Sequence, residues 1–200
     1  LLELPDGEWS FEDWIDDDGV DVGHPIRLFV KFNKKGDRLF ADWTGTSEQV
    51  KGAINNTLSF TKAATYCGVK CILPNDIPAN EGFFRCVEVK APPGTIANGV
   101  LPAACAARGL TGFRMVDCVL GALAMMLPDK VMAASDGGNT GISIDGYDAE
   151  RNPFIYVDFA CGTWGARPWA DGLSGNSHLF ANMATQSIAV GEAETPFEIL

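Results

Sequence analysis

The sequence has only two histidines, His24 and His178, and none of its six cysteines are spaced as Cys-x-x-Cys. A zinc knuckle therefore has no ligand set here, and a three-ligand metal site would have to include carboxylates. The Gly-x-Ser-x-Gly elbow and the His-Glu-x-x-His motif are missing as well. These gaps argue against the common serine-hydrolase and zinc-protease chemistries.

Basic side chains are also scarce, with 15 Lys and Arg against 26 Asp and Glu, which gives a net charge of -11. A chain this acidic lacks the cationic footprint that binds nucleic-acid backbones, and it suits a soluble protein or one with a basic partner. The longest apolar run, residues 119–127, is too short to cross a bilayer, and no signal peptide is visible. We expect a cytoplasmic protein.

The cysteines lie at positions 67, 71, 86, 105, 118 and 161. Apolar residues flank several of them, such as Val119 beside Cys118. Cys67 and Cys71 are one helical turn apart, a spacing more typical of packing than of chemistry. Because cytosolic thiols stay reduced, we expect buried thiols and not disulfides.

Hydrophobic periodicity predicts a mixture of strands and helices. Residues 26–32 alternate as in a strand, residues 33–37 have turn composition, and residues 38–43 fit the returning strand. Apolar residues at helical spacing predict a helix over 57–70. A second helix, capped by Thr111 and stopped by Pro128, is apolar on nearly all sides, which is typical of a buried helix.

We also expect a helical turn over 11–14 capped by Ser10, a strand over 83–89, a strand pair at 142–144 and 154–159, and a strand over 188–194. Strands and helices do not alternate regularly. We therefore predict an α+β fold, with a mixed sheet and hairpins packed around a buried central helix at about 112–127. The sequence starts without Met and ends within the apolar stretch 196–200, so we expect a piece of a longer polypeptide, truncated at both ends.

Three polar segments allow both functional and structural interpretations. Asp16-Asp17-Asp18-Gly19 lacks the alternating ligands of a calcium loop, so a solvated turn is favoured. Residues 135–141 lack the Lys of a P-loop and the spacing of a dinucleotide fingerprint, so we interpret them as a turn into the next strand. Residues 42–56 precede the helix at 57–70 and could cap it or bind an anion at its positive end.

Residues 161–182 have neither helix nor strand periodicity, and they combine glycines with Trp164, Trp169, Arg167, Asp171 and His178. Long irregular segments usually carry function or are disordered. Two tryptophans argue against disorder, because such side chains need burial. We therefore expect an ordered, functional loop.

Several side chains leave two roles open. Arg167 could grip a carboxylate or phosphate, or it could pair with Asp171 or another acid. His178 could make structural hydrogen bonds, or act in catalysis or, with Asp171, in metal binding. Asp76 and Glu81 flank a stiff segment and could do acid–base or metal work, or bond to their own turns.

Four segments together resemble the hydantoinase B/5-oxoprolinase family. Residues 42–55 are similar to its Asp-Phe-Ser-Gly-Thr-Ser-x-Gln-x-x-Gly-x-x-Asn phrase, and residues 75–82 to its Asp-Ile-Pro-x-Asn-x-Gly phrase. Residues 91–98 look like its Pro-x-Gly-Ser/Thr-x-x-Asn phrase, and residues 162–182 resemble its glycine-rich closing signature. The Glu-x-Glu-x-Pro that follows is matched by Glu192, Glu194 and Pro196.

Order and spacing agree over nearly the whole chain, so residues 1–200 are identified as part of a hydantoinase B/oxoprolinase-like domain. Cys86 stands where the family often has Pro, and Cys161 and Thr163 stand where it often has Gly. These departures could alter loop geometry without changing the family.

The resemblance implies an ATP-dependent enzyme that hydrolyses cyclic amides such as hydantoins and 5-oxoproline. A hydantoinase A-type subunit or domain would handle ATP and phosphorylate the substrate's oxygen. The B-type part would then act on the activated intermediate, often with a divalent metal whose ligands lie upstream of these phrases. A fragment alone would be inactive. The runner-up within the family is the alpha-type subunit of an acetone or acetophenone carboxylase, and a third interpretation is a scaffold that docks the ATP-handling subunit.

On this basis we assign two groups of site residues and leave the metal ligands unknown. The predicted catalytic residues are Asp76, Asp171 and His178. The predicted substrate-binding residues are Asn80, Glu81, Arg167 and Asn182.

Overall fold

The computed structural model describes residues 1–138, 140–181, 183 and 193. Its main sheet has the strand order β1-β2-β3-β4, formed by β1 (Gly7–Ile15), β2 (Ile26–Lys35), β3 (Arg38–Asp42) and β4 (Val87–Lys90). β1, β2 and β3 are antiparallel neighbours, whereas β4 runs parallel to β3. The hairpin expected at 26–43 is confirmed, and Gly36 supplies the positive φ of its turn.

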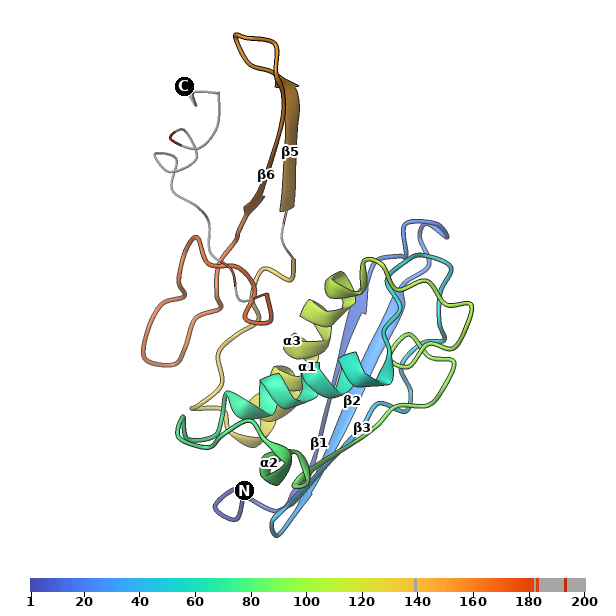
Figure 1. The fold of residues 1–200 in the computed structure, drawn as a ribbon. Coiled ribbons are helices and arrows are strands. Elements are labelled where there is room, and N and C mark those ends of the chain that lie inside the picture. The colour runs from blue at the N-terminus through green and yellow to red at the C-terminus, as the bar shows by residue number, and fades with distance from the viewer. Residues whose placement is uncertain (139, 182, 184–192, 194–200) are drawn as a thin grey trace.

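Three helices accompany the sheet: α1 (Leu58–Lys70), α2 (Glu81–Phe84) and α3 (Arg108–Met126). α1 begins after Thr57, whose hydroxyl accepts a hydrogen bond from the Phe60 backbone N–H at 3.4 Å. The cap is therefore Thr57 itself and not a side chain of the 42–56 segment for which capping was considered. α1 and α3 lie side by side on one face of the sheet, and α3 packs on β1 and β2 (Figure 1).

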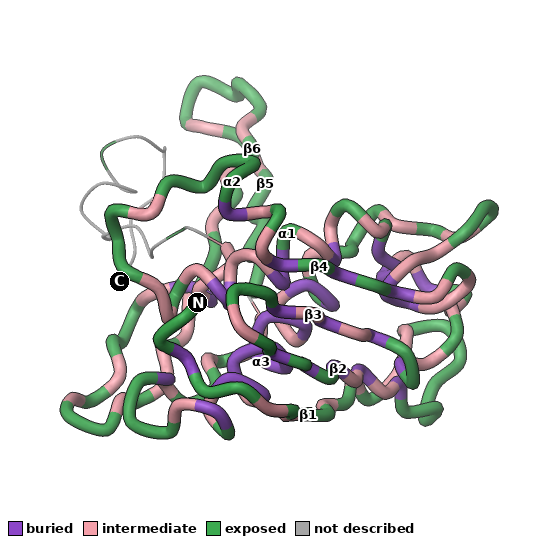
Figure 2. The backbone as a smooth tube through the Cα atoms, turned by 90° about the horizontal axis from the view of Figure 1, so that it is seen from below, coloured by how far each residue is buried: buried purple, intermediate pink, exposed green. Residues whose placement is uncertain are grey.

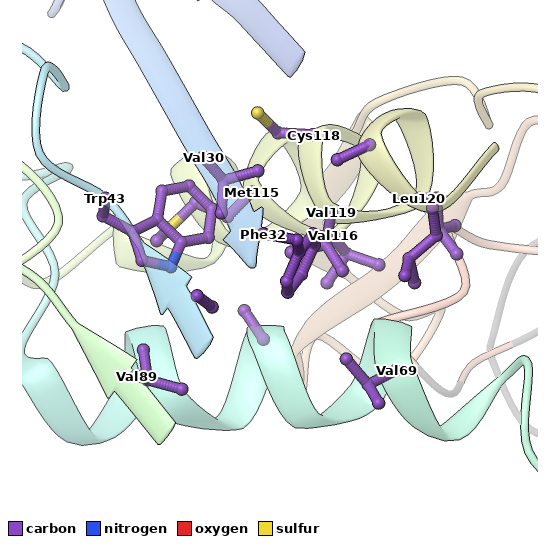
Figure 3. Packing of buried hydrophobic residues seen from close by; sticks show 14 of the residues in the cluster. Val30, Phe32, Trp43, Val69, Val89, Met115, Val116, Cys118, Val119 and Leu120 are labelled. Atoms are coloured by element: carbon purple, nitrogen blue, oxygen red, sulfur yellow. The ribbon is translucent and has the colours of Figure 1, made fainter. Parts of the chain in front are cut away.

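The core fills the space between the sheet and this helix pair (Figure 3). Alternate side chains of β2 point into it, so Leu28, Val30 and Phe32 are fully buried while their neighbours are not. Burying each such side chain stabilises the fold by about 1.5–3 kcal/mol. Trp43 is also buried, and its indole N–H donates to the Thr65 hydroxyl at 3.2 Å. Figure 2 shows the same burial concentrated in α3 and the central strands.

The buried central helix is confirmed, although it starts before residue 112. Thr111 lies inside α3 and does not cap it, since its hydroxyl donates to the Ile54 carbonyl at 2.7 Å and ties the helix to the 42–56 segment. By length and composition alone, α3 could cross a membrane, with a hydropathy of 1.4. However, 67% of the 18-residue apolar stretch of α3 is buried inside the protein, which is the behaviour of a core helix.

Two further local predictions were wrong. The helical turn expected at 11–14 belongs to β1, because pairing with β2 along its whole length outweighs the local capping signal of Ser10. The strand expected over 83–89 is confirmed only from Val87, because Asn80 accepts hydrogen bonds from the Gly82 and Phe83 N–H groups and starts α2 instead.

The predicted strand pair forms a separate two-stranded sheet of β5 (Thr140–Tyr147) and β6 (Pro153–Ala160). This hairpin projects away from the main sheet (Figure 1). The architecture is α+β, as predicted. The strand expected at 188–194 lies outside the described residues.

The cysteines follow the prediction only in part. No disulfide joins Cys67, Cys71, Cys86, Cys105 or Cys118, in agreement with the expected thiols. Only Cys118 is buried, whereas Cys71 is exposed, so apolar sequence neighbours overstated their burial.

Candidate functional site

Residues 161–181 form an ordered loop that folds on itself and on residues 131–138. Short antiparallel bridges join Thr163 to Ser174 and Arg167 to Ala170. Glycine is required for this closeness, since a Cβ on Gly165 would lie 2.0 Å from the Ala133 carbonyl oxygen. The close approaches that glycine permits are therefore made to the chain's own backbone, which fixes the shape of the loop.

His178, at the end of this loop, is buried against α3. Its Nε2 lies 3.2 Å from Oδ1 of Asp117, and both side chains are almost wholly buried. Its Nδ1 accepts a hydrogen bond from the Phe180 backbone N–H at 3.1 Å, so the proton of the neutral ring sits on Nε2 and faces the carboxylate. The approach to Asp117 is angled and lacks the geometry of a straight hydrogen bond. The ring also packs on Phe113, with 5.0 Å between centroids.

Arg114 extends this contact to the sheet. Its guanidinium pairs with Asp13 on β1 and lies 3.5 Å from Oδ2 of Asp117. Loop, helix and strand are thus joined by the ion pairs of Arg114 with Asp13 and Asp117 and by the contact of His178 with Asp117. Breaking one member of such a buried set leaves an uncompensated charge, which is costly.

The cluster around His178 does not fit a divalent metal. Both ring nitrogens already face partners, and the Arg114 cation beside Asp117 would repel a metal ion. Within the described residues, no group of three or more His, Cys, Asp or Glu could hold a metal. The metal role considered for His178 with Asp171 therefore has no support from this geometry.

Arg167 and Asp171 lie near the other end of the loop. Asp171 is exposed, and Arg167 is half-buried. The guanidinium Nη2 of Arg167 donates to the Asp171 backbone carbonyl at 3.4 Å and not to its carboxylate. Among the described residues Arg167 forms no ion pair with an acidic side chain, which leaves most of its donors available to an anion.

Asp76 and Asn80 lie in the segment between α1 and α2, and both are exposed. Asn80 caps α2 and also lines a cavity of about 920 Å³. Most of the wall is apolar, including Ile72, Ile77 and Phe83. Trp169, from the 161–181 loop, lines the same cavity, so two of the family-like segments meet there.

The polar groups at this cavity are few. The polar and ionisable residues that line it are Glu3, Asp37, Cys71, Asn80, Cys86 and Lys130. The pKa of the Cys71 thiol is raised, chiefly by a hydrogen bond with Cys67 and to a smaller extent by burial. Cys71 therefore does not supply a thiolate nucleophile at neutral pH. The arrangement suits an apolar ligand body with one polar end.

Glu81 belongs to a different hollow, of about 500 Å³, on the other side of α2. Tyr66 lines it too, and its ring stacks on Phe84 with 4.7 Å between centroids. Burial, and then the negative charge of Glu81, raise the pKa of the Tyr66 hydroxyl. Asn80 and Glu81 are thus neighbours in sequence that line different hollows.

The structure therefore brings together only part of the predicted site. Asn80 shares a cavity with the tip of the 161–181 loop, but Asp76, Arg167 and His178 are not among the residues that line it. His178 is sealed against α3, Asp76 is exposed in its turn, and Asn182 lies outside the described residues.

The two remaining family-like segments use their polar groups to hold the backbone. The buried Asn55 side chain bonds Val50 through both its oxygen and its nitrogen, and it also donates to the Ala104 carbonyl. In the 91–98 segment, Asn98 donates to the Ala91 carbonyl at 2.9 Å. These amides position loops, as expected where loop backbone is buried.

Sequence reasoning missed Asp117 and Arg114 as parts of the site region. It placed Trp169 in the functional loop but did not predict the cavity that Trp169 lines. For Asp117 a signal was present: it is an acidic residue inside an apolar helix, and buried carboxylates require a partner. Nothing in the sequence around Trp169 indicated which segment its side chain would meet.

Comparisons with known proteins match this chain along its whole length. The family model described as Hydantoinase B/oxoprolinase matches residues 1–200. A protein of Pseudomonas sp., named as the B-type subunit of a D-/L-hydantoinase, is 30% identical over 209 residues, covering 100% of this chain and 35% of that protein. The beta subunit of the caprolactamase of Pseudomonas jessenii is 30% identical over 159 residues, covering 78% of this chain and 27% of that protein.

Two solved structures share the fold. The ATP-dependent caprolactamase of Pseudomonas jessenii superposes with a TM-score of 0.80 at 23% identity, covering 98% of this chain and 34% of that one. An acetone carboxylase superposes with a TM-score of 0.80 at 14% identity, covering 95% of this chain and 28% of that one. The chain thus spans about a third of the length of these relatives.

Proposed function

The chain belongs to the hydantoinase B/oxoprolinase family, and on that premise we propose that it forms part of the B-type subunit or domain of an ATP-dependent cyclic amide hydrolase. The observation that carries the proposal is the family match over all 200 residues. It is supported by relatives whose names specify a hydantoinase, a caprolactamase and a 5-oxoprolinase. ATP would be handled by a hydantoinase A-type subunit or domain, in the cytoplasm.

The chemistry requires an activated ring carbon. Transfer of the γ-phosphoryl group of ATP to the amide oxygen, on the partner, makes that carbon electrophilic and releases ADP. Water then attacks the carbon and the ring C–N bond breaks, which leaves an acyl phosphate. A second water hydrolyses this acyl phosphate to the carboxylate and releases phosphate. Hydrogen-bond donors aimed at the developing negative charge would accelerate these steps.

We propose separate roles for the predicted site residues. The available donors of Arg167 suit the leaving phosphate, and the exposed carboxylates of Asp171 and Asp76 suit proton transfer. Asn80 would contact substrate in the apolar cavity. Glu81 and Asn182 remain proposed substrate contacts. The sealed position of His178 supports a structural, loop-holding role over direct contact with substrate.

The test is ATP turnover by the full-length chain with its A-type partner. ADP release should depend on a lactam or imide such as hydantoin, 5-oxoproline or caprolactam, with one ring opened for each turnover. Failure of every cyclic amide to stimulate turnover, together with bicarbonate-dependent carboxylation of acetone, would replace the proposal with the carboxylase alternative.

Site variants make this test sharper. We expect Asp171→Asn to lower kcat/KM by roughly 10²-fold or more, as for loss of an acid–base group. The matched control is Asp129→Asn, another exposed Asp outside the loop, which should leave turnover unchanged. Equal activity of both variants would remove Asp171 from the mechanism.

A further inference from the structure

The β5–β6 hairpin carries exposed apolar side chains on both faces. Ile142 and Ile144 are each 43% exposed on one face, and the other face is more exposed. On that other face the register places Asp145 opposite Ile155, Ser143 opposite Val157, and Gly141 opposite Phe159, and opposite residues of an antiparallel pair point to the same side. The large apolar side chains on this side are 72%, 75%, 59% and 41% exposed at Tyr147, Ile155, Val157 and Phe159, respectively. We call these four side chains the hairpin face.

Little within the described chain covers this face. Among the named elements, β5 and β6 pack chiefly on each other, and the hairpin stands clear of the main sheet and its helices (Figure 1). Figure 2 shows most of the hairpin as exposed. Two-stranded hairpins are marginal in water, and a contiguous exposed apolar patch marks an interaction surface.

The charges of the hairpin restrict what can cover the face. Within residues 140–160 one basic side chain, Arg151, accompanies four acidic ones: Asp145, Asp148, Glu150 and Asp158. Asp145 lies on the hairpin face itself, opposite Ile155. Two copies of this chain, each with a net charge of -11, would bring like charges together here, and inward-pointing charges oppose such self-pairing.

We propose that the hairpin face is a docking surface for the hydantoinase A-type partner, through an apolar patch on that partner bordered by basic side chains. The inference rests on the proposed function, because it takes the partner from there. Tyr147, Ile155, Val157 and Phe159 would supply the buried centre of the contact, and Asp145 would supply its charge complementarity. Aromatic anchors surrounded by a polar rim are typical of such interfaces.

The first experiment measures the affinity between the full-length chain and the A-type subunit of the same organism. Ile155→Thr/Val157→Thr keeps β-branched side chains, and hence the strand preference, but removes apolar surface. We expect the Kd to rise at least about tenfold. The matched control is Val20→Thr/Val22→Thr, because these valines on the main body are 59% and 75% exposed, and this variant should bind normally.

The second experiment tests the charge. Asp145→Lys should slow association with the partner about tenfold and remove most of the salt dependence of the association rate, because steering by complementary charge is screened by salt. The melting temperature of the full-length chain alone should change little in any of these variants.

Each other outcome overturns the inference in a distinguishable way. Unchanged Kd for Ile155→Thr/Val157→Thr, with normal lactam-dependent turnover, removes the docking surface and leaves the proposed function standing. A lowered melting temperature of the isolated chain with unchanged Kd shows that the face is covered by the chain itself. If the full-length chain forms dimers as its concentration rises, and Ile155→Thr/Val157→Thr abolishes them, the hairpin face binds a second copy of the chain. If the unsubstituted chain binds no A-type subunit, the proposed function fails as well.

Discussion

His178 Nε2 lies 3.2 Å from Asp117 Oδ1, and this contact joins a loop that looked catalytic in the sequence to the buried helix at the centre of the fold. Both side chains are almost wholly buried, and Arg114 links the carboxylate onward to Asp13 on β1. His178 therefore anchors the glycine-rich loop to the core helix, and the rest of the loop extends from there toward solvent.

A double-mutant cycle tests whether these two side chains act as a pair. Asp117→Asn and His178→Gln should each destabilise the protein, and the double variant should lose less than the sum, with a coupling energy of about 1–3 kcal/mol. The measurement is urea unfolding followed by near-UV circular dichroism. A cycle of His178→Gln with the exposed Asp129→Asn serves as the control and should be additive within about 0.5 kcal/mol. Additivity in both cycles would show that the contact contributes no coupling.

Close packing between α1 and α3 depends on Gly68. A Cβ at this position would lie 2.4 Å from Cγ1 of Val119, so adding a methyl group requires the Val119 side chain or one of the two helices to shift. We expect Gly68→Ala to lower the free energy of unfolding by about 1–3 kcal/mol, although alanine is the better helix former. Gly109→Ala, in the first turn of α3 with no atom within 4 Å, is the matched control. It should leave stability unchanged or raise it by up to about 1 kcal/mol. Similar effects of the two changes would mean that the helices do not approach as closely as described.

The acidic turn at Asp16-Asp17-Asp18 gives the stability a defined pH dependence. Asp18 accepts hydrogen bonds from the backbone N–H groups of Gly52, Asp21 and Val20, which lower its pKa from 3.8 to about 2. Because the folded-state pKa is depressed, the contribution of Asp18 is complete above about pH 4 and is lost as the pH falls toward 2. Chemical denaturation at intervals between pH 5 and pH 2 should show this loss, and Asp18→Asn should flatten it. An unchanged slope in the variant would assign the acid sensitivity to other groups.

The elements found from sequence are those whose signal is local. The alternation in β2 and the helical spacing in α1 each lie within one short window, and both elements appear close to their expected bounds. β1 was mistaken for a helical turn because its stability comes from pairing with a strand that follows it in the sequence. Likewise, Asn80 starts a helix inside an expected strand, because a cap of two hydrogen bonds outweighs weak alternation.

The candidate site was harder to predict because it depends on contacts between distant segments. Sequence motifs identified the loops correctly as special, but not which side chains would face a common cavity. Asn80 and Trp169 meet there, whereas His178 turns inward toward Asp117. Residue type alone could not separate these cases, since a histidine beside glycines fits a catalytic base and a buried anchor equally well.

The parallel pairing of β3 with β4 has a consequence for synthesis of the chain. Leu39 pairs with Val87, so the strands that lie next to each other are separated by α1 and α2 in the sequence. While the ribosome has released only the residues before β4, the outer edge of β3 has unpaired backbone groups and can join a foreign strand. The nascent chain is therefore most vulnerable to misassembly during this interval, and chaperone binding should be concentrated there.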